Sequence, residues 1–194
     1  MRISIMTNAG DIAKLIGKAN QSQIRKATAR SLNEIMRGAK ASSARDIKQE
    51  VNLKIGEIKQ GMADVKAKAS MPIDQQHATI FYSGKHIPLY KFQAKRKVVG
   101  RSRVTKVALY GVTVKVKKQR KIVKGAFLAT MPNGKQGIFR RLGKERLKIA
   151  QHYGPTIANI ASNDTVKEKI RQQVRSRYMA IFTRNLAYYI GRRS

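Results

Sequence analysis

The sequence predicts an α+β protein with N-terminal helices, a central antiparallel β-sheet and a C-terminal helix packed on that sheet. Apolar residues recur at three- and four-residue steps in residues 1–70 and again in residues 155–194, which is typical of helices that bury one face. Between them, short apolar runs alternate with turn residues, which is typical of strands. We therefore expect a single domain, 1–194, made of a helical section (1–70), a basic β-sheet section (75–154) and a C-terminal helix (155–194).

The first section is expected to be helical to about Ala69. Asp11 is a candidate N-cap for a helix through Ile12 and Ile16. A second apolar stripe runs from Ile24 to Ala39, where the small residues of AKASSAR leave three options: the helix ends, kinks or continues. A shorter helix is expected near residues 52–62.

The middle section begins with two extended segments. Residues 77–83 (HATIFYS) form a strand, because β-branched and aromatic side chains favour strands. Residues 87–90 form another extended piece, and Pro88 places it at a sheet edge because proline cannot donate a backbone hydrogen bond. Residues 95–97 and 101–103 flank Gly100 and are expected to form a mobile basic loop.

The clearest half-buried strand lies at residues 112–117, where three valines alternate with polar side chains. Val107 and Leu109 fall on the opposite parity, so we expect a β-bulge at Gly111 that resets the alternation. Residues 117–121 (KKQRK) then form the tip of a hairpin whose second strand starts at Ile122.

Residues 124–156 are expected to form three short strands that lead into a helix. The strand Gly125–Met131 carries apolar residues on both faces, so we expect it to be buried on both sides. The pattern continues with a turn at 132–134, a strand at 137–141, a turn at 142–144 and a third run at 147–153 that ends at Gly154-Pro155, with Pro155 in the first turn of the next helix.

The last section predicts one long helix. Ser162-Asn163-Asp164 offers a cap. The apolar stripe that follows comprises Val166, Ile170, Val174, Tyr178, Ile181, Phe182, Leu186, Tyr189 and Ile190.

Charge is the most unusual property of the chain. It has 42 Lys and Arg against 10 Asp and Glu, a formal net charge of +32, and residues 75–144 contain no acid at all. Such self-repulsion destabilises a compact chain unless a polyanion neutralises it, which favours nucleic acid first, with anionic membranes and acidic proteins behind. No apolar run approaches the ~20 residues of a transmembrane helix, so we expect no membrane association. The absence of cysteine fits assembly in a reducing cytoplasm.

Lysines and arginines on the loop, the hairpin and one strand predict contact with phosphates or with an acidic protein. Such contacts follow the backbone of nucleic acid without reading its bases. The alternative is a solvated surface, because lysine also protects exposed strand edges from aggregation. The candidate residues are Lys95, Arg96, Lys97, Arg101, Arg103, Lys115, Lys117, Lys118, Arg120, Lys121, Arg140 and Arg141.

We expect no catalysis, no cofactor and no metal site. His77, His86 and His152 share no ligand spacing, and without cysteine no zinc set of the usual kind exists. A metal-dependent nuclease needs clustered carboxylates, which the β section lacks. Residues 137–144 (GIFRRLGK) differ from a phosphate-binding loop, having five residues between the glycines instead of four and a glutamate where Ser or Thr should follow.

The segment 124–156 resembles the minor tail protein Z (tail completion) family of tailed bacteriophages. The residues that carry the resemblance are Gly125-Ala126-Phe127, Ala129, Met131, Asn133-Gly134, Gly137, Phe139, Arg141, Gly143-Lys144, Arg146-Leu147, Ile149 and Tyr153-Gly154-Pro155.

This resemblance implies a structural virion protein at the head-proximal end of the tail, which aids head–tail joining and DNA passage. The implied partners are the tail terminator, tail tube or neck proteins and the genomic DNA, with several copies in a ring or another symmetric assembly. A ribosomal or other RNA-binding protein is the alternative that size and basicity also fit.

Overall fold

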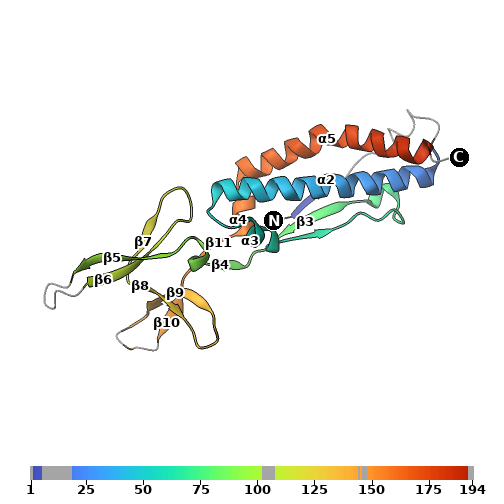
Figure 1. Ribbon diagram of the computed structural model, residues 1–194. Helices are drawn as coiled ribbons and strands as arrows, with labels where there is room; N and C mark the ends of the chain where they lie inside the picture. The colour runs from blue at the N-terminus through green and yellow to red at the C-terminus, as the bar shows by residue number, and fades with distance from the viewer. Residues whose placement is uncertain (1, 6–18, 102–107, 144, 146–147, 192–194) are drawn as a thin grey trace.

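The computed structural model describes residues 2–5, 19–101, 108–143, 145 and 148–191 of the 194-residue chain (Figure 1). The molecule is elongated, with a helical body at one end and a β-rich lobe at the other. The mixed α+β class is confirmed, although the strands of the described residues form four small antiparallel sheets instead of one central sheet.

The longest element is helix α2 (Gln21–Glu50). It starts with a capping box, in which the Asn20 side chain accepts from the Gln23 amide and the Gln23 side chain accepts from the Asn20 amide, both at 2.9 Å. The helix continues through the serine-rich segment because its serines find partners. Ser42 Oγ donates to the Gly38 carbonyl at 3.1 Å, and Ser43 Oγ shares a 2.8 Å hydrogen bond with the Tyr82 hydroxyl.

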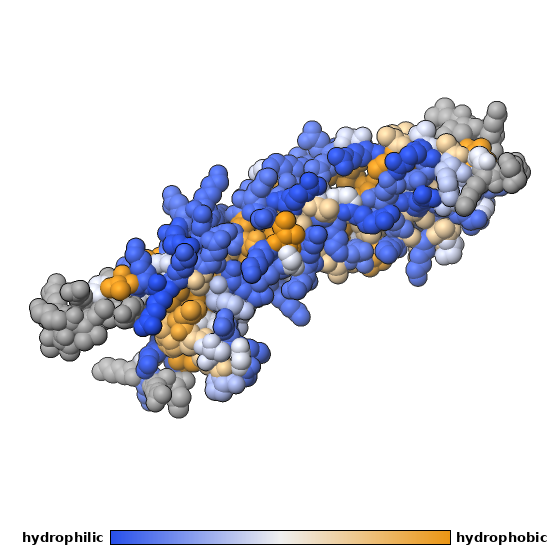
Figure 2. All heavy atoms as spheres, in the orientation of Figure 1, coloured by the Kyte–Doolittle hydropathy of each residue, from blue (hydrophilic) through white to orange (hydrophobic). Residues whose placement is uncertain are grey.

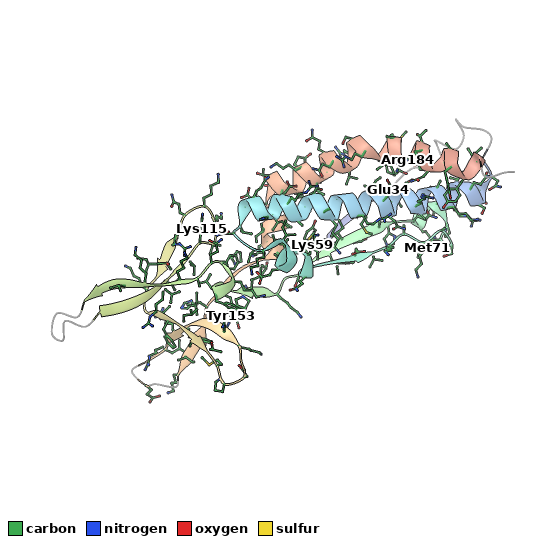
Figure 3. The ribbon with its side chains drawn as sticks, in the orientation of Figure 1. Glu34, Lys59, Met71, Lys115, Tyr153 and Arg184 are labelled. Atoms are coloured by element: carbon green, nitrogen blue, oxygen red, sulfur yellow. The ribbon has the colours of Figure 1, made fainter. Side chains whose placement is uncertain are left out.

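Helix α5 (Asp164–Gly191) confirms the predicted C-terminal helix and packs along α2. Its buried Phe182 and Leu186 meet Ile24 and Ala27 of α2. Polar contacts add to this seam: Figure 3 shows Glu34 and Arg184 facing each other between the two helices, where they form an ion pair. The helix was expected to pack on a sheet, but its main partner is α2, which lies between α5 and the sheet of the body (Figure 1).

That body sheet has the order β1-β3-β2, formed by β1 (Arg2–Ile5), β2 (Met62–Val65) and β3 (Ala78–Tyr82). The predicted strand at 77–83 is confirmed as β3, and the short helix near 52–62 as α3 (Ile55–Gln60). Strand β2 contradicts the expectation that the whole first section is helical. It pairs with β3, with Met62 opposite Tyr82, and this non-local pairing has no local signal in the sequence. The predicted helix behind Asp11 lies outside the described residues.

Residues 86–156, called the β lobe here, are inserted between β3 and helix α4 (Ile157–Ala161). The chain enters through β4 (His86–Pro88) and leaves through β11 (Tyr153–Thr156), and these two strands pair antiparallel. Proline 155 was expected in the first turn of a helix but lies in β11. Thr156 is the N-cap instead, and its Oγ1 accepts from the Asn159 amide at 3.1 Å. Two 3₁₀ turns, η1 (Ile73–Gln75) and η2 (Leu89–Lys91), flank the entry strands β3 and β4.

The first sheet of the lobe has the order β5-β6-β7, with β5 (Lys95–Arg101), β6 (Ala108–Val114) and β7 (Lys121–Val123). The prediction of a basic loop at 95–97 is wrong, because these residues belong to β5. The predicted bulge is also misplaced, since the register shifts between Val98 and Gly100, whereas Gly111 pairs regularly with Lys97. The valine face is confirmed, with Val112 and Val114 buried.

The second sheet of the lobe has the order β10-β9-β8, with β8 (Ala126–Thr130), β9 (Gln136–Arg141) and β10 (Ile149–Gln151). The turn at 132–134 is confirmed, and Gly134 has a φ of +75°, which a side chain would disfavour. Strand β8 was expected to be buried on both sides, but it is an edge strand, and Leu128 is 47% exposed.

Candidate polyanion-binding surface

The predicted cationic residues all fall within the β lobe, but they do not form one cluster. Those with described side chains are exposed, except for Lys115, which is half-buried. Arg101 ends β5, and Arg103 lies outside the described residues. The others occupy three places: strand β5 (Lys95, Arg96, Lys97), the β6–β7 connection with its flanks (Lys115, Lys117, Lys118, Arg120, Lys121) and the end of β9 (Arg140, Arg141).

The β9 arginines point away from each other, because successive side chains of a strand lie on opposite faces. The Arg141 guanidinium lies 5.9 Å from the centre of the Phe127 ring, close enough for a cation–π contact. Phe127 in turn packs at 6.2 Å from Phe139. Figure 2 shows apolar residues gathered over this part of the lobe, surrounded by hydrophilic ones. Arg141 therefore contacts an aromatic ring of its own sheet.

Arg120 holds the β6–β7 connection in place. Its Nη1 donates to the Gln93 carbonyl at 2.8 Å and lies 3.3 Å from Thr113 Oγ1. Arg120, a candidate for contact with an external polyanion, thus has a guanidinium that binds backbone and side-chain oxygens of its own lobe.

Two backbone hydrogen bonds fix the start of the same connection. The Lys115 amide donates to the Phe92 carbonyl, and the Asn52 amide donates to the Val116 carbonyl, both at 2.9 Å. Because Asn52 follows the end of α2, the second bond joins the lobe to the helical body. Figure 3 shows Lys115 at this junction. The start of the connection is therefore fixed to the helical body.

A cleft of about 680 Å³ opens between this connection and the C-terminal end of α2. Lys117, Lys118 and Lys121 line it from the lobe, and Glu50 lines it from α2. A second cleft of about 480 Å³ lies near Asn52 and is lined by further lysines, namely Lys48, Lys54 and Lys91. Sequence reasoning missed the contribution of α2 to both clefts, because the lobe and the end of α2 meet only in the folded chain.

The charges of the lobe are poorly neutralised from within. Residues 75–144 contain no acid, so any partner of their cations must come from elsewhere. Lys91 has such a partner in Glu57 of α3, at 3.1 Å. Within the lobe, Glu145 pairs with Lys148. In the body, ion pairs join neighbouring elements, as Lys40 and Asp64 join α2 to β2, and also neighbouring turns of α5, as between Glu168 and Arg171. The lobe thus carries a concentrated positive field that suits an external polyanion.

No group of three or more His, Cys, Asp or Glu side chains that could hold a metal ion is found among the described residues. Within the same residues, no helix combines the length and apolarity needed to cross a membrane.

Comparison with known proteins gives one family. A family model described as prophage minor tail protein Z (GPZ) matches residues 11–192, and this match includes both long helices and the whole β lobe. No curated protein and no solved structure matches the chain.

Proposed function

The chain belongs to the prophage minor tail protein Z family, and from this premise we propose that it is a tail completion protein at the head-proximal end of the tail. Membership of this family makes it a structural protein of a phage tail. The finer role that we propose is to make the tail competent to join the head and to let DNA pass, without a catalytic step.

The observation that carries this proposal is the β lobe at one end of an elongated molecule, whose residues 86–144 contain no acid and whose only acid is Glu145. A protein beside the path of a genome needs to offset phosphate charge without recognising sequence. Exposed lysines on strand β5 supply that charge from a hydrogen-bonded scaffold, and such contacts are independent of base sequence.

We also propose that several copies surround the tail axis, with the tail terminator, tail tube or neck proteins as neighbours. Nine of the ten acids lie outside the lobe in the sequence, at positions 11, 34, 46, 50, 57, 64, 74, 164 and 168, whereas the lobe carries Glu145. This asymmetry favours an arrangement in which lobes face polyanions and bodies contact proteins. A ribosomal or other RNA-binding role has only size and charge in its favour, and the tail role accounts for both.

The first prediction is non-specific binding to duplex DNA. If about six to ten phosphates are neutralised, affinity should fall about 10³- to 10⁵-fold between 50 and 200 mM salt. The variant Lys95→Gln/Lys97→Gln should reduce the slope of log affinity against log salt by about two, since each phosphate contact contributes about 0.9. Fluorescence anisotropy with two unrelated 30-base-pair duplexes measures both quantities.

The matched control is Lys169→Gln/Arg175→Gln, which removes two exposed charges from α5. It should leave the slope nearly unchanged. An equal effect of both variants, or a strong preference for one duplex, would contradict a phosphate-binding lobe. Labelling of the protein in assembled virions tests the position separately, and a label at the distal end of the tail would rule out the head-proximal role.

A further inference from the structure

The cleft between the β6–β7 connection and the end of α2 combines two kinds of surface. Its floor is apolar and consists of Leu89 and Val114, which are buried, and Val116, which is half-buried. Its rim carries three exposed lysines, Lys117, Lys118 and Lys121. Simple phosphate binding has no use for such a floor, because a phosphodiester backbone has no apolar group of matching size to bury.

The cleft is held in shape from both sides. The hydrogen bond from Asn52 to the Val116 carbonyl joins its floor to the body, and the Arg120 guanidinium ties the far end of the connection to Gln93. A site whose walls are fixed before binding loses less conformational entropy when it binds a partner.

The positive charge at the rim exceeds what the cleft can neutralise itself. Glu50 contributes one negative charge, and the C-terminal end of α2 contributes the equivalent of roughly half a charge. Three ammonium groups outweigh both. The site therefore retains a net attraction for carboxylates above an apolar floor.

We propose that this cleft binds an acidic segment of a partner polypeptide that carries one bulky apolar side chain. The apolar side chain rests on the floor, and flanking carboxylates lie beside the lysines. This inference rests on the proposed function, since it names the chemistry by which a tail or neck neighbour recognises the chain. Duplex DNA fits less well because its bases are stacked inside and only phosphates would reach the cleft. A second copy also fits less well, since this chain has 10 acids against 42 bases.

The test uses the full-length protein and three probes: the peptide GDEFDEG, its control GDESDEG, and a 20-base-pair DNA duplex. The first peptide should bind about tenfold more tightly than the second, because only the first can bury an aromatic ring. In methyl NMR spectra, the peptide GDEFDEG should shift the signals of Leu89 and Val116, and the duplex should leave these signals unchanged.

Two variants test the contribution of the lysine charges and that of the apolar floor separately. Lys117→Gln/Lys118→Gln should weaken the aromatic peptide about tenfold, the effect expected for two lost ion pairs. Val116→Ser keeps every charge, and it should weaken the aromatic peptide several-fold while leaving the serine peptide unchanged. Lys95→Gln/Lys97→Gln is the matched control, expected to weaken the duplex and to spare both peptides.

The outcomes separate this inference from the proposed function. Equal affinity for the two peptides, or duplex-induced shifts of the floor methyl groups, would overturn the peptide site and assign the cleft to the DNA-binding surface. Peptide binding that persists when no salt-dependent DNA binding is found would support the cleft and contradict the phosphate contacts of the lobe.

Discussion

At the scale of single residues, several positions that carry the family resemblance have a structural role. Gly134 occupies a turn with positive φ, and Gly154 lies against the buried ring of Phe92. A Cβ atom at position 154 would lie 2.9 Å from Cζ of Phe92 and closer still to Cε2. Phe139 is buried in the second sheet of the lobe. These residues therefore shape the fold of the lobe.

Gly154→Ala should therefore destabilise the protein. Phe92 is fully buried and cannot move aside freely, so we expect a loss of about 1–3 kcal/mol, the usual cost of overpacking a core. The control is Gly143→Ala, because among the described residues no atom beyond its chain neighbours lies within 4 Å of the position that its Cβ would take. Chemical denaturation of both variants measures the difference. Equal stability of the two variants would show that β11 adjusts to the added methyl group.

Glu34 gives the helix pair a dependence on pH. The hydrogen bond from Arg184 lowers the pKa of Glu34 below its usual value, and Asn185 adds to this effect. A lowered pKa means that the stabilisation is present above the unfolded value of about 4.3 and is lost as pH falls through the folded value. Because Glu34 is 33% and Arg184 63% exposed in their side chains, we expect at most about 1 kcal/mol.

Glu34→Gln should accordingly lower the melting temperature at pH 7, and the gap to the parent protein should close towards pH 3. Thermal melts across this range provide the measurement. A gap that stays constant at pH 3 would mean that packing, and not the ion pair, accounts for the effect.

At the scale of elements, the sequence predicted what depends on local pattern. The long helices followed from apolar stripes such as Val166, Ile170 and Val174, and β3 followed from its β-branched and aromatic residues. Local patterns in the sequence could not predict β2 or the strand at residues 95–97, because these segments become strands by pairing with other strands. For the same reason, the apolar pattern of β8 predicts a strand buried on both sides, whereas β8 lies at the edge of its sheet and exposes Leu128. The cationic residues were identifiable from sequence, but the cleft beside α2 was not.

The β6–β7 connection offers a test of this non-local organisation. Arg120→Gln should destabilise the lobe by about 1 kcal/mol, because it removes hydrogen bonds from the guanidinium to Gln93 and Thr113. Lys118→Gln, on the same connection, should stay within about ±0.5 kcal/mol. Urea denaturation distinguishes them. If both variants behave alike, the guanidinium contacts add nothing measurable in solution.

At the scale of the whole molecule, a net charge of +32 opposes compactness. Ion pairs in the body offset part of this repulsion, as between Lys40 and Asp64, but the lobe has little internal compensation. The folded protein alone in dilute buffer is therefore less stable than it would be in the presence of a polyanion.

The melting temperature should consequently rise with sodium chloride between 20 and 300 mM, by about 2–4 °C for each kcal/mol of repulsion relieved. Differential scanning fluorimetry checks this, with an equal osmolarity of sucrose to separate charge screening from general solute effects. A melting temperature that is flat in salt would show that the excess charge is spread too widely to strain the fold.

The pairing of β4 with β11 has a further consequence. Because β4 and β11 pair, the chain enters and leaves the lobe at neighbouring points, and the lobe is joined to the body through this strand pair. Residues can be gained or lost beyond this pair without changing the distance that the body must bridge. Relatives could therefore change the lobe and its contacts while keeping one helical frame, so sequence divergence between relatives should concentrate beyond the β4–β11 pair.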